Sequence, residues 1–217
     1  MTFLSKKIPA NIQYGFTVEK KDFSPSLISQ VHGDDIIEVS GRAHWETLRQ
    51  LPVKADGVWT SQPEIELYVF SADCLPVLFF GKSPESPIAA VHSGWRGALQ
   101  GIVKKTSTQL AKTNSELYAV LGPSILGCCF EVKEDFVQAF QERNKPVAPF
   151  LEKSRGRMFF DLPRYVREIE LADIPEERLE MEENRCTYCS APPLPSYRRN
   201  GGTDPRIRAW IRKRSLL

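Results

Sequence analysis

The pattern of apolar residues changes near Gly97, and this change constrains the fold more than any other feature of the sequence. Before about residue 94, short segments rich in β-branched and aromatic residues alternate with Gly, Pro, Asp or Ser, which is typical of strands. These segments are FTVEK, SLISQV, IIEV, DGVWTS, ELYVFS, LPVLFFG and IAAVHS. After Gly97 the apolar residues recur at helical spacing and predict a helix of about four turns that packs on the sheet. Its inward face is Leu99, Ile102, Val103, Thr106 and Leu110.

The second half of the chain mixes strands and helices without a regular repeat. ELYAVLG predicts another strand, and helical patterns cover residues 133–143, 162–171 and 205–213. Asp204 and Pro205 suit the N-cap and first residue of the last helix. Because regular β-α alternation is missing, we predict a mixed α/β or α+β fold and not a doubly wound parallel sheet. We expect one domain over residues 1–217.

The overall charge is close to neutral. Lys and Arg number 29 against 27 for Asp and Glu, a formal charge of +2, which predicts neither a nucleic-acid nor a membrane partner. The first twenty residues have no apolar run typical of a signal peptide. The five cysteines are an odd number, so we interpret them as thiols of a cytoplasmic protein rather than a disulfide framework. We expect a monomer or a weak homodimer.

Two of the three histidines lie beside glycines at the ends of predicted strands. His32 is in QVHG and His92 is in VHSGWRG, and Cys74 follows a break in a third strand, in SADCLPV. Two imidazoles and a thiolate suit zinc, and three protein ligands leave a fourth position open. A second interpretation makes Cys74 a nucleophile and His92 its base. The residues alone do not separate these two hypotheses.

A series of motifs resembles the YfiH-like family, once called polyphenol oxidases. QVHG, ADGVWTS, SADCLPV, AAVHSGWRG, LGPSILGCCFEV, CTY and SYRR follow one another in the family's order from about His32 to about Arg206. The resemblance implies an α/β/β/α sandwich with mixed sheets, similar to the catalytic domain of cytotoxic necrotizing factor. It also implies that His32, Cys74 and His92 are the metal ligands, with zinc as the expected ion and copper as the alternative.

The resemblance implies a set of activities. Family members are described as copper-dependent phenol oxidases, as enzymes of purine nucleoside phosphorolysis and adenosine deamination, and in one branch as editors of peptidoglycan precursors. We therefore expect a metal-dependent enzyme whose partners are a purine nucleoside (adenosine, inosine, guanosine or methylthioadenosine) and phosphate. The alternatives are a Cys74/His92 amidohydrolase and a copper oxidase. A true laccase needs more His and Cys ligands than this chain has.

Further polar residues near these motifs are candidates for the site. Asp73 precedes Cys74 and is either a proton carrier or a hydrogen-bond acceptor at the bend. Arg96 follows His92 at the start of a predicted helix, where an anion is favoured. Arg198 and Arg199 of SYRR have the forked geometry that binds phosphate. We predict that Arg96 and at least one of the SYRR arginines form a phosphate pocket.

Other candidates have ordinary interpretations. Cys186 and Cys189 form half of a zinc-knuckle pattern, but a second CxxC is absent, and adjacent Cys128 and Cys129 are not expected to complete it. We interpret one of the adjacent pair as a buried thiol that supports the site and the other as incidental. His44 is interpreted as a surface histidine. The tail, SYRRNGGTDPR, departs from the family's SYRRDG-x-TGR, which leaves the role of Arg206 open.

Overall fold

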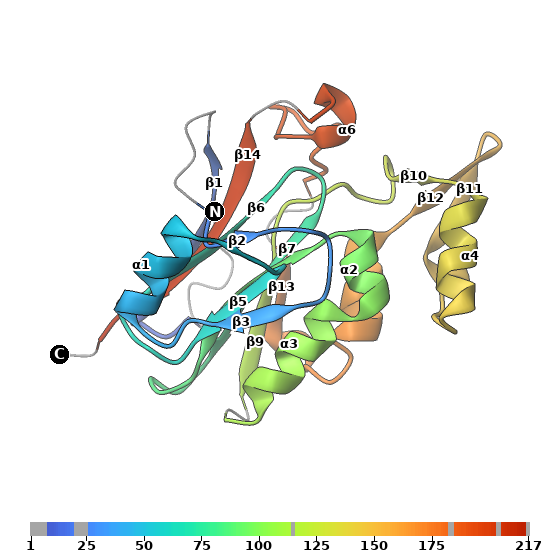
Figure 1. The fold of residues 1–217 in the computed structure, drawn as a ribbon. Coiled ribbons are helices and arrows are strands. Elements are labelled where there is room, and N and C mark those ends of the chain that lie inside the picture. Colours follow the sequence, from blue (N-terminus) through green and yellow to red (C-terminus); the bar gives the residue numbers. More distant parts are fainter. Residues whose placement is uncertain (1–7, 20–25, 114–115, 182–184, 203–204, 216–217) are drawn as a thin grey trace.

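A six-stranded mixed sheet forms the centre of the protein (Figure 1). The computed structural model describes residues 8–19, 26–113, 116–181, 185–202 and 205–215. The strand order is β13-β9-β7-β8-β5-β3, antiparallel in the middle and parallel at both edges. The strands are β3 (Ile36–Glu38), β5 (Gly57–Thr60), β7 (Leu75–Gly81), β8 (Ile88–Ser93), β9 (Leu117–Leu121) and β13 (Leu179–Met181).

Both faces of this sheet are buried. Along β7, Val77 and Phe79 pack into one core, and Leu78 and Phe80 pack into the other. The alternation follows the two-residue period of a strand, and a strand buried on both faces is expected to be a continuous apolar run. LPVLFFG is such a run, which explains why the sequence predicts this strand so directly.

A three-stranded antiparallel sheet packs on one face of the central sheet through the second core. Its order is β1-β14-β6, formed by β1 (Ile12–Glu19), β14 (Arg206–Lys213) and β6 (Glu66–Ser71). The helix predicted at 205–213 is therefore wrong. Ile207, Ala209 and Ile211 are buried in alternation with residues of intermediate exposure, so the true period is two. Asp204, the expected N-cap, lies outside the described residues.

Helices cover the opposite face of the central sheet (Figure 1). They include α2 (Trp95–Gln100), α3 (Ile102–Ala111) and α5 (Leu162–Tyr165), which continues as a π-helix (Val166–Glu170). Helix α4 (Glu134–Glu142) lies to the side of the sheet (Figure 1), and its buried residues extend the same core. The predicted four-turn helix after Gly97 is divided in two, because Gly101 adopts a left-handed conformation with φ of +82° between α2 and α3. Helix α1 (Arg42–Gln50) was not predicted; its Trp45 and Leu48 pack into the second core.

The remaining elements are short and mostly peripheral. They are β2 (Ile28–Ser29), β4 (Val53–Lys54), β10 (Glu131–Val132), β11 (Leu151–Ser154), β12 (Arg157–Phe160), α6 (Tyr197–Asn200) and the 3-10 turns Ala148–Phe150 and Glu176–Arg178. The observed fold is thus mixed α+β with several sheets, two of them stacked. No helix within the described ranges is long and apolar enough to cross a bilayer.

Candidate active site

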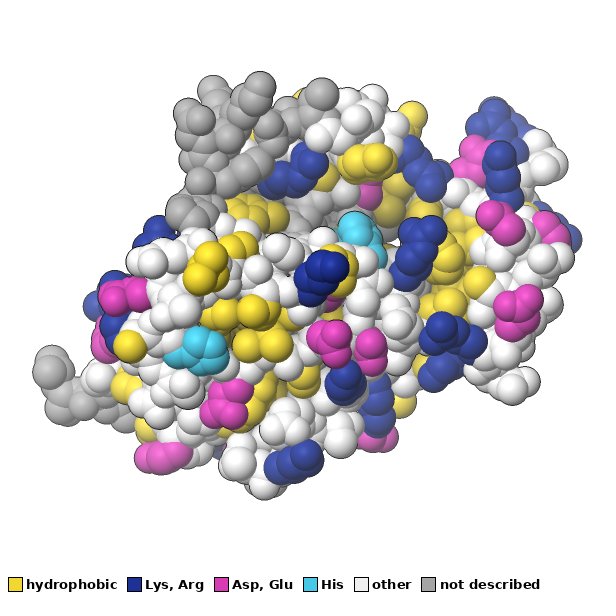
Figure 2. All heavy atoms as spheres, viewed as in Figure 1, with side chains coloured by type: hydrophobic (Ala, Val, Ile, Leu, Met, Phe, Trp, Pro, Cys, Tyr) yellow, Lys and Arg dark blue, Asp and Glu magenta, His cyan; other side chains and the backbone are white. Residues whose placement is uncertain are grey.

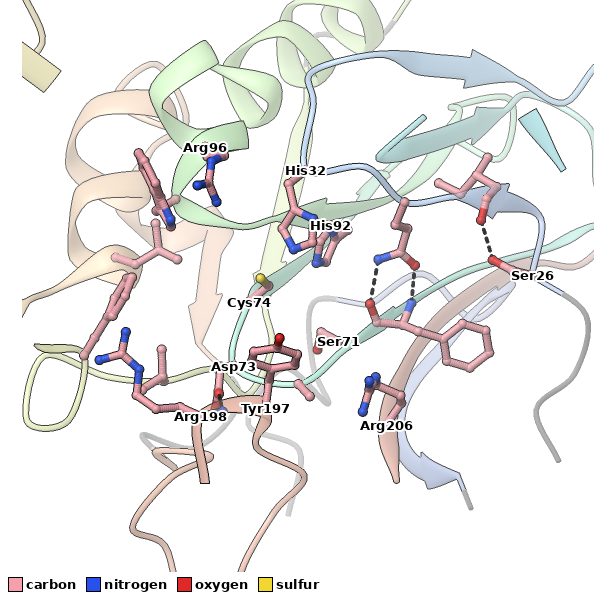
Figure 3. A pocket seen from close by; sticks show the side chains of 18 of the residues that line it. Ser26, His32, Ser71, Asp73, Cys74, His92, Arg96, Tyr197, Arg198 and Arg206 are labelled. Carbon is pink, nitrogen blue, oxygen red and sulfur yellow. Dashed lines mark hydrogen bonds between the residues drawn. The ribbon is translucent and has the colours of Figure 1, made fainter. Parts of the chain in front are cut away.

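Three side chains with metal-binding atoms meet at one end of the central sheet (Figure 3). His32 lies in the loop between β2 and β3, Cys74 precedes β7, and His92 is near the end of β8. Their ligand atoms all lie within 4.8 Å of one another, and the two imidazole centroids are 4.9 Å apart at 78°. The structure therefore brings together the three residues selected from the sequence, which we call the His-Cys-His cluster.

Strand pairing and backbone conformation place these side chains. In the antiparallel β7-β8 pair, Leu75 lies opposite Ser93, so Cys74 arrives next to the end of β8 that carries His92. His32 has a φ of +61° and Asp73 a φ of +83°, conformations that are uncommon for residues other than glycine. Such outliers persist where the surrounding structure holds them, and they gather at functional sites.

Gly94 provides the space for the cluster. A Cβ atom at this position would lie 3.0 Å from Cys74 Sγ and 3.0 Å from His32 Cδ2. The close approach of two candidate ligands therefore favours glycine at the first glycine position of HSGWRG, Gly94. The sequence motif contains this requirement, but only the structure shows which side chains impose it.

Asp56, which the sequence analysis did not select, orients two members of the cluster. It is fully buried, and its Oδ1 lies 2.8 Å from His92 Nδ1. The same carboxylate accepts backbone N–H bonds from Val31 (3.1 Å), His32 (2.9 Å) and Gly33 (2.7 Å). An Nδ1-carboxylate pair leaves Nε2 of His92 as the atom for a ligand, as second-shell carboxylates do in metal sites. The available signal was the aspartate in the ADGVWTS motif.

The charges of the cluster stabilise one another. Burial opposes ionisation of Cys74, but the charge of His92 and hydrogen bonds from both histidines lower the pKa of the thiol to about 6. Burial opposes protonation of His92, but the Cys74 thiolate and the Asp56 carboxylate raise its pKa to about 9. Burial also opposes ionisation of Asp56, yet its hydrogen bonds lower the pKa of that carboxyl. Without a metal, the site therefore favours a thiolate beside an imidazolium.

Asp73 lies beside the cluster with both carboxylate oxygens already engaged. Oδ1 accepts from Thr187 Oγ1 (2.6 Å), and Oδ2 accepts from Ser196 Oγ (3.1 Å) and the backbone N–H of Arg198 (2.7 Å). The side chain is only 9% exposed. Of its two interpretations, this geometry favours the hydrogen-bonding one, in which Asp73 fixes the segment that carries Tyr197 and Arg198.

The arginines selected from the sequence separate into two groups. Arg96 and Arg198 line the pocket at the cluster, and Arg206, whose role was left open, lines it from another side (Figure 3). Arg96 stacks on Trp95 at 4.4 Å from the ring centroid, and Arg198 lies 5.2 Å from the Phe130 centroid. Arg199 is not among the lining residues. Its guanidinium donates to the carbonyl oxygens of Thr187, Tyr188 and Leu194 and so braces its own loop.

The pocket has a volume of about 720 Å³, within the usual range for small-molecule sites. Apolar and aromatic side chains form much of its wall, with the His-Cys-His cluster and the three arginines among them. Figure 2 shows Lys and Arg side chains around a hollow in which a His side chain is visible. The apolar and aromatic lining residues are Ile28, Phe70, Trp95, Ile125, Phe130, Leu162 and Tyr197.

A second group of donors lies outside the pocket lining. The thiols of Cys128, Cys129, Cys186 and Cys189 all lie within 4.8 Å of one another. We expected that Cys128 and Cys129 would not complete the half-knuckle of Cys186 and Cys189. That expectation is wrong, because the turn at residues 127–129 brings both adjacent thiols close to the other two. The expected buried member of the pair is also absent, since Cys128 is exposed and Cys129 half-buried, whereas Cys186 is buried. His44 lies on α1 and contacts Ser40.

Comparison with known proteins identifies the family. The model of a family described as multi-copper polyphenol oxidoreductase laccase matches residues 10–213, and the chain belongs to this YfiH-like family. It is 34% identical over 186 residues to a purine nucleoside phosphorylase of Aquifex aeolicus, covering 85% of this chain and 80% of that protein. It is 30% identical over 187 residues to the purine nucleoside phosphorylase YfiH of Escherichia coli, covering 86% and 73% of the two chains.

Solved structures show the same fold. YlmD from Geobacillus stearothermophilus has a TM-score of 0.74 at 24% identity, covering 95% of this chain and 93% of its own. The Neisseria meningitidis protein NMB0706 has a TM-score of 0.79 at 23% identity, covering 96% and 97%. The mixed α+β architecture is therefore that of the family. The similarity to cytotoxic necrotizing factor stays a prediction.

Proposed function

We propose that this protein is a zinc-dependent enzyme that cleaves purine nucleosides with phosphate. The observation that carries the proposal is the position of the His-Cys-His cluster inside a pocket that three arginines also line. Relatives at 30% to 34% identity are named purine nucleoside phosphorylases, which favours this chemistry for the same pocket.

The donor set fits zinc. His32 and His92 offer imidazole nitrogens and Cys74 offers a thiol of low pKa, and a metal site with three protein ligands is the usual arrangement in zinc enzymes. Donor atoms within 4.8 Å of one another are close enough to share an ion with bonds of about 2.0 to 2.3 Å after small rotations. A bound zinc ion would supply Lewis-acid polarisation of a substrate oxygen.

The arginines account for the phosphate requirement. Arg96, Arg198 and Arg206 approach the pocket from three segments of the chain, and guanidinium groups bind phosphate oxygens through paired hydrogen bonds. Phosphate held by these groups as HPO₄²⁻ attacks C1′ of the ribose, the C1′–N9 bond breaks, and the purine leaves with that electron pair. The proton that the phosphate brought passes to the purine, which gives the neutral base and ribose 1-phosphate. The arginines hold and orient the nucleophile, which converts an encounter between two ligands into a positioned reaction.

The apolar wall and one serine account for nucleoside binding. Phe70 and Tyr197 provide aromatic surface for a flat base. Ser71 is 2% exposed and lines the pocket, and its Oγ has no hydrogen-bond partner among the described residues. A buried hydroxyl without a partner is costly, so we assign Ser71 to a hydrogen bond with the substrate. The side-chain amide of Gln30 donates to the carbonyl oxygen of Phe70 (2.7 Å) and accepts from its backbone N–H (2.8 Å). These two bonds fix the end of β6 that carries the Phe70 ring.

An assay panel tests this function. The protein is stripped of metal, refilled with zinc and incubated with adenosine, inosine, guanosine and methylthioadenosine, with and without phosphate. We expect free base and ribose 1-phosphate (methylthioribose 1-phosphate from methylthioadenosine) only when both zinc and phosphate are present. Free base formed equally without phosphate, or full turnover by the stripped protein, contradicts the proposal. His44→Ala is the matched control for His32→Ala and His92→Ala, because His44 lies away from the pocket.

A second candidate is nucleophilic catalysis by Cys74. The observation that favours it is the closeness of the Cys74 thiol to the His92 imidazole, whose ligand atoms lie within 4.8 Å of each other. Each group favours the charged form of the other, which lowers the pKa of the thiol and raises the pKa of the imidazole, as in thiol amidohydrolases. If Cys74 is the nucleophile, the protein should still turn over an amide substrate after metal removal, and a thiol reagent should abolish that turnover. Adenosine deamination in the same pocket is distinguished in the panel by inosine formation without phosphate.

Copper oxidation receives no such support. The chain has three histidines, of which His44 is not among the lining residues of the pocket. The remaining two belong to one three-membered cluster, so a multi-copper arrangement lacks ligands.

A further inference from the structure

The second donor group joins two segments that are far apart in the sequence. Cys128 and Cys129 lie in a turn between β9 and β10, and Cys186 and Cys189 lie in a turn before α6. Their four sulfur atoms are mutually within 4.8 Å, and Cys128 Sγ is 3.8 Å from Cys189 Sγ. All four are free thiols. We call this group the four-cysteine cluster.

The spacing of the sulfur atoms fits an ion better than a disulfide. A tetrahedron with zinc-sulfur bonds of about 2.3 Å has sulfur atoms about 3.8 Å apart, which is the separation of Cys128 and Cys189. A disulfide brings each bonded pair of sulfur atoms to about 2.05 Å, far closer than the 3.8 Å between Cys128 Sγ and Cys189 Sγ. Four thiolates around zinc are the usual closed, structural type of site.

Backbone contacts hold both turns in register independently of the sulfur atoms. Ser124 and Cys186 form a parallel bridge, and the N–H of Thr187 donates to the carbonyl of Ser124 (3.0 Å). The N–H of Ser190 donates to the carbonyl of Cys186 (3.0 Å), which closes the CxxC turn. The scaffold therefore presents the thiols to one point before any ion binds, which lowers the cost of binding.

We propose that the four-cysteine cluster binds one zinc ion as a structural site separate from the His-Cys-His cluster. The ion ties the turn after β9 to the segment from Cys186 to α6. That segment carries Thr187, which bonds Asp73, and the carbonyl groups that receive Arg199. A zinc ion at this position stabilises the wall of the pocket on which Arg198 lies, and it takes no part in bond making.

Metal content tests the proposal. Zinc-refilled wild-type protein should hold about two zinc ions per chain, one open and one closed site. The Cys186→Ser/Cys189→Ser variant and the His32→Ala/His92→Ala variant should each hold about one. Retention of both zinc ions by the cysteine variant overturns the proposal. It is also overturned if wild-type protein purified with reductant holds one ion and carries a disulfide among these four cysteines.

Thermal unfolding supplies a readout that does not depend on activity. With zinc present, the cysteine variant should melt lower than wild type by on the order of 10 °C. After metal removal most of this difference should disappear, and only the cost of replacing the buried Cys186 thiol should remain. A difference of the same size with and without zinc shows that the thiols act by packing alone and overturns the proposal.

Cobalt titration of the wild type keeps the test decisive if the variant does not fold. Cobalt bound by four thiolates gives much stronger thiolate-to-metal absorption than cobalt bound by the single thiolate of the His-Cys-His cluster. Two spectrally distinct classes of bound cobalt are expected, and a single class of one-thiolate type overturns the proposal. These results are independent of whether nucleosides are substrates.

Discussion

The His-Cys-His cluster and the four-cysteine cluster differ in ligand number, chemistry and surroundings. The first offers three mixed donors inside a pocket, and a buried carboxylate, Asp56, orients His92. The second offers four identical donors between two turns outside the pocket lining. Three ligands leave a position for substrate, whereas four thiolates close the coordination sphere. The comparison teaches that one chain can present an open set of three mixed donors at the end of its central sheet and a set of four thiols between two turns.

The largest difference is expected when one sulfur is removed from each cluster. Cys74→Ala should lower nucleoside turnover by at least about 1,000-fold, because it removes a ligand or a nucleophile and leaves a small cavity. Cys189→Ala, the matched substitution in the other cluster, should lower turnover by less than about tenfold. Steady-state kinetics and zinc analysis of the two variants check this. Equal losses would show that the two clusters are not functionally distinct.

The next difference concerns the groups that position the candidate metal ligands. Asp56→Asn should reduce zinc affinity of the His-Cys-His cluster by roughly 10 to 100-fold, the usual effect of losing a second-shell carboxylate. Among the described residues, the contacts that hold the two turns of the four-cysteine cluster are backbone hydrogen bonds, so its zinc should be retained. Competition with a chelator measures this, because zinc should leave the His-Cys-His cluster at a lower chelator concentration than it leaves the four-cysteine cluster. Unchanged release of both ions contradicts the role given to Asp56, whose pKa is lowered by its contacts.

A smaller effect is expected on the phosphate side of the pocket. Arg96→Ala should raise the KM for phosphate by roughly tenfold, the loss of one charged hydrogen bond of about 1.5 kcal/mol. Arg42→Ala is the matched control, because Arg42 also stacks on a tryptophan (4.6 Å from Trp45) but lies on α1. Adenosine deamination, which uses water in place of phosphate, should change less if it takes place in this pocket. If zinc stays bound and both reactions fall equally, Arg96 holds the loop and does not bind phosphate.

The smallest effect on activity is expected from the scaffold, where the stability of the fold should depend on pH in the direction opposite to metal loss. Burial raises the pKa of Glu170 to about 8, although its carboxylate accepts from the backbone N–H groups of Val103 and Lys104. The folded state therefore holds this proton more tightly than the unfolded state, and stability falls as pH rises from about 4.5 to about 8. Metal loss from either cluster instead follows falling pH, since the ligands must be deprotonated.

Glu170→Gln removes the titration and keeps the shape of the side chain. Urea unfolding of metal-stripped protein between pH 5 and 8 should show a decline in wild type and a flatter profile in the variant. Parallel profiles would mean that Glu170 does not titrate in this range. The stripped protein is used so that metal release does not obscure the comparison.

Much of the fold follows from short-range patterns. Continuous apolar strands such as β7 and β8 were predicted because both of their faces are buried. Strand β14 was predicted as a helix because Asp204 and Pro205 suit a helix start and the apolar run from Ala209 to Ile211 interrupts the alternation that would indicate a strand. Its true state depends on pairing with β1 and β6, which are remote in the sequence.

The site was predictable where motifs carry its ligands and not where distant segments meet. His32, Cys74 and His92 came from motif residues, and the structure brings them together. Asp56 was missed, although it belongs to the ADGVWTS motif, because its partners lie on other segments and the motif alone does not show which groups it contacts. The four-cysteine cluster was missed because ligand spacing rules assume paired CxxC turns, whereas a vicinal pair supplies two of its sulfur atoms.

Strand β14 has a consequence for how the chain reaches this structure during synthesis. It lies between β1 and β6 (Figure 1) and joins two strands that do not pair with each other. Until its residues leave the ribosome, β1 and β6 cannot form their sheet, and the apolar face of the central sheet that Ala209 and Ile211 cover stays open to solvent. Such late, long-range closure slows folding and exposes the growing chain to aggregation. Chaperone demand should therefore depend on the interval between the emergence of β6 and the emergence of β14.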